Sequence, residues 1–258
     1  MSNLVIILAA GKGSRMGLPE GQSKCGVIVP GLNRSSVDRL IDQFYLRGER
    51  QFVVVLGYGA ESVVESISDH KNHIKFVYNQ FYETHGCGYS LSLVAPYLNS
   101  VTNGAVYILE GDSIYSDDNI STIYNYELSG SLVRSSNYLS RRSVGVICDE
   151  INPECDDYQK IISYVYDQSH EADFKNIKSL FSDGYSLYES MQLWKIFGDN
   201  IKYFSESLYP IKSTSSNLYS YRNMIRHNRI LLPIHSTDPT RWINLNTKED
   251  LNKVVEVI

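Results

Sequence analysis

Short runs of branched apolar residues recur along the first half of the chain, and amphipathic segments separate them. The runs that predict buried strands lie at residues 4–9, 51–57, 74–79 and 105–109. Segments with helical spacing run from Ser35 or Ser36 to about Leu46, and then cover residues 60–67 and 89–98. This alternation predicts an α/β protein with a Rossmann-like, mostly parallel mixed sheet flanked by helices.

The pattern changes from about Leu128, where polar loops separate shorter elements. Strand-like stretches lie at residues 143–148, 160–166 and 230–234, and helical spacing is expected at residues 186–197 and 248–258. Internal repeats and linker-like segments are absent from the sequence. We therefore expect one domain, residues 1–258, whose second half adds a small subregion to the sheet.

Composition narrows the class of protein. Hydrophobic residues make up 43% of the 258 positions, charged residues make up 21%, and the net charge is -5. A negative net charge argues against a non-specific nucleic-acid binder, which needs cations to displace phosphate counterions. No apolar run is long enough to cross a bilayer, and the first residues lack a basic region, so no membrane association and a cytoplasmic location are expected. The four cysteines lack metal-binding spacing, which favours reduced thiols.

A glycine-rich loop carries the most informative chemistry. Leu8-Ala-Ala-Gly-Lys-Gly-Ser-Arg-Met-Gly17 follows the first predicted strand, and Lys24 comes seven residues later. Small residues let backbone N–H groups approach a triphosphate, and glycines permit the backbone angles that this requires. Lys12 and Arg15 bring positive charge to the β- and γ-phosphates, while Lys24 can reach the α-phosphate or an incoming phosphate. The glycine spacing fits neither the dinucleotide fingerprint nor the P-loop.

A second group of candidates follows the strand at 105–109, as Glu110-Gly111-Asp112. In parallel sheets, ligands bind beyond the carboxyl ends of the strands. Gly11 and Asp112 both lie at such ends, so the two motifs are predicted to meet at one edge of the sheet.

The loop resembles the Leu-Ala-Ala-Gly-x-Gly-x-Arg signature of the nucleotidyltransferase superfamily, which includes the sugar-1-phosphate nucleotidyltransferases. One departure is that Ser23-Lys24 stands where the family usually has Pro-Lys. The segment from Asn79 to Val94 resembles bacterial choline-phosphate cytidylyltransferases, and the similarity continues weakly through Trp194 and residues 219–228 and 242–251.

The resemblance implies a nucleotidyltransferase fold and a CTP-using enzyme. Residues 1–127 would bind the nucleotide, and residues 128–258 would bind the acceptor and complete a metal site. Lys24, Arg15 and Lys12 are the expected catalytic residues. The expected nucleotide-binding residues, several acting through backbone groups, are Leu8, Ala9, Ala10, Gly11, Gly13, Asn79, Gly86, Ser90, Glu110 and Gly111. For Ser90, a helix N-cap or a surface position is an equal alternative.

Joining two anions requires Mg²⁺ as cofactor, with oxygen ligands. Asp112 is the expected ligand, Asn246 the favoured second and Asn244 its alternative, although relatives often have an acidic residue there. Asp250 is expected to stabilise the first turn of the last helix instead. The reaction would be in-line attack by an ionised phosphate or phosphonate oxygen, without a general base.

The acceptor stays open at this stage. The candidate acceptor-binding residues are Arg134, Glu189, Trp194, Arg222 and Arg226. Aromatic and carboxylate groups suit choline, whereas the arginines suit a neutral or anionic head. The alternatives are a sugar-1-phosphate nucleotidyltransferase using UTP or dTTP, and a non-catalytic nucleotide sensor. A homodimer is a further expectation left open.

Overall fold

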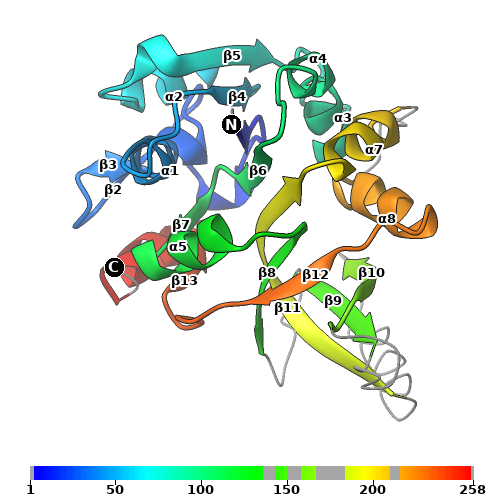
Figure 1. Cartoon of the computed structure of the whole chain (residues 1–258). Helices are drawn as coiled ribbons and strands as arrows, with labels where there is room; N and C mark the ends of the chain where they lie inside the picture. The colour runs from blue at the N-terminus through cyan, green and yellow to red at the C-terminus, as the bar shows by residue number, and fades with distance from the viewer. Residues whose placement is uncertain (1–2, 136–142, 150–157, 167–183, 210–215, 257–258) are drawn as a thin grey trace.

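The computed structural model of the chain describes residues 3–135, 143–149, 158–166, 184–209 and 216–256 (Figure 1). The strands are β1 (Leu4–Ala9), β2 (Ile28–Val29), β3 (Arg34–Ser35), β4 (Phe52–Leu56), β5 (Ile74–Tyr78), β6 (Ala105–Glu110), β7 (Ser113–Tyr115), β8 (Gly130–Ser135), β9 (Val144–Asp149), β10 (Ile161–Tyr166), β11 (Tyr185–Phe197), β12 (Leu232–His235) and β13 (Trp242–Asn244). The helices are α1 (Ser36–Tyr45), α2 (Ala60–Ser66), α3 (Cys87–Ser92), α4 (Ala95–Leu98), α5 (Asp117–Asn125), α7 (Asn200–Ser207), α8 (Leu218–Arg226) and α9 (Lys248–Lys253). Short 3₁₀ turns are η1 (Ser14–Met16), η2 (Lys24–Gly26), η3 (Lys71–His73) and η5 (Val254–Glu256).

A nine-stranded mixed sheet runs through the molecule in the order β10-β9-β11-β6-β1-β4-β5, with β8 paired to β11 and β12 paired to β8. The pairs β6–β1, β1–β4 and β4–β5 are parallel, whereas β11 is antiparallel to β6, β8 and β9. The α/β fold with a parallel core and flanking helices is therefore confirmed.

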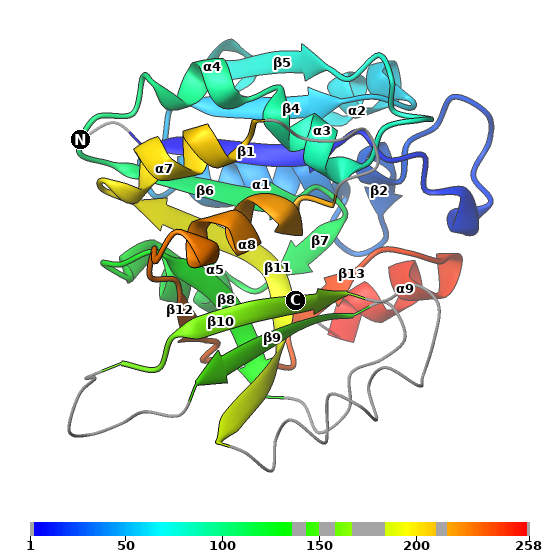
Figure 2. The same ribbon diagram turned by 90° about the vertical axis from the view of Figure 1, so that its right-hand side faces the viewer.

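Helices cover both faces of the parallel strands (Figure 2). Along β1, alternate side chains enter two cores, as strand geometry requires. Leu4, Ile6 and Leu8 belong to the core that also contains residues of α3, α4, α7 and α8, while Val5 and Ile7 belong to the core that contains residues of α1, α2 and α5. Because both faces are buried, these strands are apolar throughout.

The helix predicted at residues 186–197 is wrong, because this segment forms the long strand β11. Trp194 and Ile196 pack into one core, and Met191 and Leu193 into the other. A strand that is buried on both faces carries apolar residues at even and odd positions alike. The alternation that identifies a strand is then lost, and the apolar residues of this segment also fit helical spacing.

Strand β11 changes its neighbours halfway along. Tyr185–Glu189 pairs with β9, and Leu193–Phe197 pairs with β6. Between them, Gln192 adopts a positive φ of 59°, and the register against β8 shifts. Tyr115 of β7 donates from its hydroxyl to the carbonyls of Met191 (2.7 Å) and Gln192 (3.2 Å). The irregular turn of backbone is thus held by a side chain from another element.

Two other helix boundaries differ from expectation. The helix expected at residues 89–98 is two short helices, α3 and α4, with Pro96 in the first turn of α4. Proline has no N–H to donate, so it favours a new helix start over continuation. The helix expected at residues 248–258 is α9 followed by the 3₁₀ turn η5, and Asp250 completes a capping box with Thr247. No helix within the described ranges is long and apolar enough to span a bilayer.

We expect Lys195→Met to destabilise the fold by about 3 kcal/mol. Lys195 is buried in β11, and its ammonium donates to the carbonyls of Tyr124 (2.8 Å), Ile123 (3.3 Å) and Tyr126 at the end of α5. Burial lowers the pKa of Lys195 to about 8, so the group still carries most of its charge at neutral pH. Urea unfolding measures the loss, with Lys202→Met on the exposed side of α7 as control. Equal stability of the two variants would contradict this role.

Candidate nucleotide and metal site

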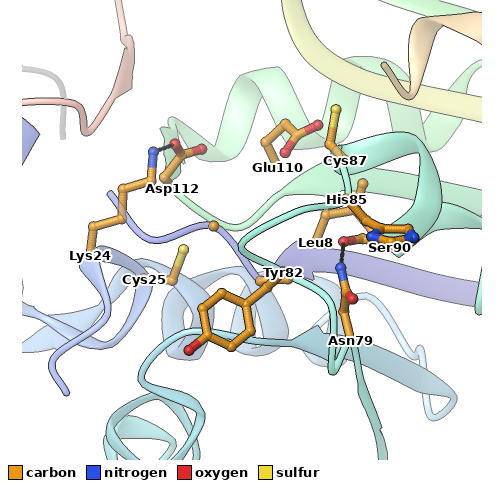
Figure 3. A pocket seen from close by; sticks show the side chains of 12 residues that line it. Leu8, Lys24, Cys25, Asn79, Tyr82, His85, Cys87, Ser90, Glu110 and Asp112 are labelled. Carbon is orange, nitrogen blue, oxygen red and sulfur yellow. Dashed lines mark hydrogen bonds and ion pairs between the residues drawn. The ribbon is translucent and has the colours of Figure 1, made fainter. Parts of the chain in front are cut away.

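A cavity of about 130 Å³ opens at the carboxyl ends of β1 and β6 (Figure 3). The residues predicted from sequence that line it are Leu8, Ala10, Gly11, Lys24, Asn79, Ser90, Glu110 and Asp112. They come from the glycine-rich loop, the end of β5, α3 and the end of β6. The structure thus brings together two motifs that lie about a hundred residues apart in the chain.

The glycine-rich loop follows β1 directly. Two glycines, one in the loop and one at the end of β6, are required because neighbouring atoms leave no space for a Cβ. Gly13 has a φ of +61°, and a Cβ there would lie 2.9 Å from both Cγ and Cδ of Lys24. Gly111 donates its N–H to the carbonyl of Leu8 at 2.8 Å, and a Cβ there would lie 2.9 Å from that oxygen. The first glycine leaves space for the lysine, and the second lets the ends of β1 and β6 meet.

Lys24 and Asp112 form a largely buried ion pair on one side of the cavity (Figure 3). Burial alone would lower the pKa of Lys24, but the charge and hydrogen bond of Asp112, together with the neighbouring Cys25 and Glu110, outweigh this effect and the pKa is raised. Lys24 is therefore cationic at neutral pH. Only one carboxylate oxygen, Oδ2, contacts the lysine, while Oδ1 is buried and accepts no hydrogen bond from the described residues.

A second carboxyl group, that of Glu110, lies beside this pair. Burial, and then the neighbouring carboxylate of Asp112, raise the pKa of Glu110 to about 8. Asn217 donates from Nδ2 to Oε1 of Glu110 at 2.5 Å. The site therefore holds one carboxylate paired with Lys24 and a second one, that of Glu110, which is mostly protonated at neutral pH.

Asn79 and Ser90 form a polar pair on the opposite side of the cavity (Figure 3). Asn79 donates from Nδ2 to Oγ of Ser90 at 2.9 Å, and its Oδ1 accepts from the N–H of Phe81 at 2.8 Å. Ser90 is buried inside α3, whose N-cap is Gly86, so neither an N-cap role nor an exposed position applies to it. The pair presents hydrogen-bonding groups in an otherwise enclosed place.

The C-terminal strand fixes the amide side chains next to Asp112. The N–H of Leu245 donates to the carbonyl of Asp112 at 2.7 Å, and β13 pairs with β7. Asn246 accepts from Arg15 at 2.7 Å through Oδ1 and donates to Oδ1 of Asn244 at 3.1 Å. Asp250 accepts from the N–H groups of Asn246 (2.9 Å) and Thr247 (2.8 Å), which matches the structural role expected for it.

These residues fit a Mg²⁺ ion held partly by phosphate. The buried Oδ1 of Asp112, which accepts no hydrogen bond from the described residues, is the kind of oxygen ligand that such an ion prefers. The side-chain oxygen of Asn246 is a second candidate, and Arg15 would have to release it before it bound the ion. The described residues contain no cluster of three or more His, Cys, Asp or Glu side chains that could hold a metal alone. A metal here would therefore take several ligands from substrate and water.

A second hollow, which we call the polar groove, has a volume of about 560 Å³. Arg15 and Asn246 belong to its lining, as do Arg134 and Glu189 from β8 and β11. Figure 2 shows the N-terminal loop and α9 on the same side of the molecule. Because Leu245 bonds to Asp112 and Asn246 bonds to Arg15, the polar groove lies next to the cavity.

Three residues predicted to bind an acceptor are placed elsewhere by the structure. Trp194 is 1% exposed and stacks on Tyr221 in the core, with ring centroids 4.8 Å apart. Arg222 donates to the carbonyl of Tyr164 from Nε (3.1 Å) and Nη2 (2.6 Å). Arg226 is exposed at the end of α8. None of these three residues lines the cavity or the polar groove.

Two other residues of the predicted site, Lys12 and Ala9, do not line the cavity. Lys12 forms an exposed ion pair with Glu83 at 3.6 Å and lies 5.4 Å from the ring centroid of Tyr58. Ala9 is buried in the core on the α1 side of the sheet, because neighbouring residues of β1 face opposite ways.

Four further residues line the cavity and were not predicted from the sequence, namely Cys25, Tyr82, His85 and Cys87. Three of them fall within the segment 79–94 that carried the resemblance, so the signal was present in that segment. Asn217 was also missed as the partner of Glu110. It lies 107 residues away in the chain, and no local pattern indicates such a contact.

Comparison with known proteins places this architecture among the nucleotidyltransferase-like folds. The inositol-1-phosphate CTP transferase from T. maritima superposes with a TM-score of 0.72 at 16% identity, covering 99% of this chain and 94% of that one. The CTP:phosphocholine cytidylyltransferase LicC from Streptococcus pneumoniae gives a TM-score of 0.66 at 16% identity, covering 100% and 99%.

A curated relative, the bifunctional protein GlmU from Gloeothece citriformis, is 32% identical over 119 residues, which are 43% of this chain and 24% of GlmU. The chain thus aligns with about a quarter of that relative. The model of the family described as domain of unknown function DUF6564 matches residues 32–258. The chain belongs to this family.

We expect the ion pair between Lys24 and Asp112 to show strong coupling in a double-mutant cycle. Lys24→Met and Asp112→Asn should each cost about 3 kcal/mol, because each leaves a buried charge without its partner. The double variant should lose less than the sum of the two, with a coupling energy of about 2 kcal/mol. Urea unfolding at pH 7 provides the four free energies, and simple additivity would contradict a coupled pair.

Proposed function

We propose that this protein is a Mg²⁺-dependent cytidylyltransferase that transfers CMP from CTP to a small phosphate or phosphonate and releases pyrophosphate. The observation that carries the proposal is the composition of the cavity. It combines a glycine-rich loop, a buried lysine–carboxylate pair with a free carboxylate oxygen, and an enclosed Asn79–Ser90 pair. These features suit a triphosphate, a metal and a nucleobase respectively.

The phosphate side of the proposal rests on charge and space. Lys24 is cationic, and it reaches the cavity across Gly13. On substrate binding, its ammonium would exchange the carboxylate of Asp112 for a phosphate oxygen. Arg15, now bonded to the neutral Asn246, has its charge available for an anion at the mouth of the site. Lys12, at the rim, would guide the triphosphate through its exposed charge.

The nucleobase would lie between the ends of β1 and α3. Leu8, Ala10 and Gly11 form one wall, and Asn79 and Ser90 supply side-chain hydrogen bonds from the other. Cytosine as the base is favoured because two of the structural neighbours are CTP-using transferases by their names. Glu110, being mostly protonated, would avoid repelling the phosphates.

In the reaction, an acceptor phosphate oxygen forms a bond to the α-phosphorus as the bond to the pyrophosphate oxygen breaks. The nucleophile is already ionised at neutral pH, so the protein contributes positioning and charge stabilisation. Mg²⁺, held by Asp112 and Asn246, would offset the negative charge on the phosphates. Asn244, which binds Asn246 and Gln192, would orient the second ligand.

Pyrophosphate release with CTP, UTP, ATP, GTP and dTTP tests this function, in the presence of Mg²⁺ and a panel of small phosphates and phosphonates. We expect turnover with CTP alone. Turnover with UTP or dTTP and a sugar 1-phosphate would assign the protein to the sugar nucleotidyltransferases instead. Tight nucleotide binding without turnover for any pair would indicate a sensor.

A matched pair of glycine variants tests the route of Lys24 into the site. Gly13 and Gly17 both have positive φ, 61° and 55°, so an alanine strains the backbone similarly at each. A Cβ at Gly13 collides with the side chain of Lys24, whereas a Cβ at Gly17 meets nothing within 4 Å. Gly13→Ala should lower kcat/KM for CTP on the order of 100-fold.

Gly17→Ala is the control and should change that constant far less than Gly13→Ala. Equal losses in the two variants would mean that backbone strain in the loop, and not the position of Lys24, governs activity.

A further inference from the structure

We propose that the polar groove selects an acceptor whose non-reacting part is neutral and rich in hydroxyl groups, as in a polyol phosphate, and that it rejects quaternary ammonium groups. The inference rests on the proposed function, because it assigns the acceptor of that reaction. The polar groove adjoins the cavity through the Arg15–Asn246 and Leu245–Asp112 hydrogen bonds. An acceptor phosphate near Arg15 would therefore place the rest of its molecule in the polar groove.

The carboxylate that a cation would need is already neutralised. Glu189 is 4% exposed. Its Oε2 accepts from Nε of Arg134 at 2.8 Å and lies 2.8 Å from Nη2 in the same ion pair, and its Oε1 accepts from Oγ of Ser143 at 2.5 Å. Both oxygens are thus satisfied by groups of the protein, so Glu189 has little charge left to attract an ammonium group.

The aromatic face that a cation would need is covered as well. The guanidinium of Arg134 lies 4.8 Å from the ring centroid of Trp242, and its Nη1 donates to the carbonyl of Pro239 at 3.3 Å. A quaternary ammonium binds by contact with such faces. Here the protein's own cation occupies that place, and a second cation would meet like charge.

The rest of the lining offers neutral hydrogen-bonding groups. Gln192 and Asn244 are joined through Oε1 and Nδ2 at 2.8 Å, and Asn246 follows two residues later. Gln192 is placed there by the positive φ at the irregular turn of β11, which Tyr115 holds through its hydroxyl. The amide groups of Gln192, Asn244 and Asn246 thus provide hydrogen-bond donors and acceptors in fixed positions, which suits the recognition of hydroxyl groups.

The balance of charge in the polar groove supports the same acceptor class. The carboxylate of Asp250 accepts hydrogen bonds from the N–H groups of Asn246 and Thr247, at the start of α9. The other charged side chains of the described lining, besides the Arg134–Glu189 pair, are Arg15 and Lys253, and both are cationic. The described lining thus holds three cations (Arg15, Arg134 and Lys253) and two carboxylates (Glu189 and Asp250), and this excess of positive charge favours a phosphate over an ammonium.

The direct test compares ribitol 5-phosphate, glycerol 3-phosphate and phosphocholine as acceptors with CTP and Mg²⁺, using the whole chain. We expect kcat/KM for the better polyol phosphate to exceed that for phosphocholine by about 100-fold or more. Preference for phosphocholine would overturn the inference.

Calorimetric titration of the protein with ribitol 5-phosphate and with phosphocholine separates this inference from the proposed function. Tighter binding of the polyol phosphate without turnover with any nucleotide would overturn the proposed function and leave the polar groove's assignment intact. Tighter binding of phosphocholine would overturn the assignment of the polar groove, whatever the turnover.

Arg134→Ala tests the cause of the selectivity. The change uncovers Trp242 and releases the carboxylate of Glu189, which together form the combination that binds quaternary ammonium groups. We expect phosphocholine to bind about 10-fold more tightly than to the wild type, and the polyol phosphate to bind more weakly. Arg50→Ala is the control and should change neither affinity, because Arg50 precedes β4 at the amino ends of the parallel strands, away from the polar groove.

A second variant avoids the unpaired buried carboxylate that can impair folding of Arg134→Ala. The double variant Arg134→Ala/Glu189→Gln carries neither charge. It should narrow the preference for the polyol phosphate, because no guanidinium covers Trp242, and it should gain less affinity for phosphocholine than Arg134→Ala does, because the carboxylate is gone. Unchanged selectivity in this variant would show that the Arg134–Glu189 pair does not decide the acceptor.

Discussion

The ion pair between Lys24 and Asp112 joins the two parts of the chain on which the cavity depends. Lys24 belongs to the loop after β1, and Asp112 follows β6, at a sequence separation of 88. Breaking such a buried pair on one side typically costs about 3–5 kcal/mol, so the pair fixes the loop as strongly as a core contact would. The same two side chains carry the charge and the free oxygen that a triphosphate and a metal require. Stability and chemistry are therefore tied to one contact, and Gly13 leaves the space that the side chain of Lys24 occupies.

The second half of the chain shapes the neighbouring polar groove through strand β11. The strand leaves β9, changes direction at Gln192 and continues along β6. This irregularity brings Glu189 and Gln192 to the edge that also holds β13. A regular strand would continue one ladder and offer no such opening, so the positive φ at Gln192 and its support by Tyr115 are part of how the polar groove is built.

The parallel core and the meeting of the two motifs could be predicted because they depend on local signals. Apolar runs ended by glycine indicate buried strands, and parallel strands end at one edge. Strand β11 could not be predicted, since burial on both faces removes the alternation that identifies a strand. The contacts of the acceptor-side arginines could not be predicted either. Sequence shows that Arg222 and Arg134 are cationic, but only tertiary packing shows that one binds a carbonyl of β10 and the other a carboxylate of β11.

The most direct test of the central claim is a crystal structure of the protein with CTP and Mg²⁺, without acceptor. The account predicts that the triphosphate lies along the loop from Gly11 to Gly13, with Lys24 moved from Asp112 to a phosphate oxygen and the metal at Oδ1 of Asp112. A nucleotide bound elsewhere, with the Lys24–Asp112 pair intact, would contradict it.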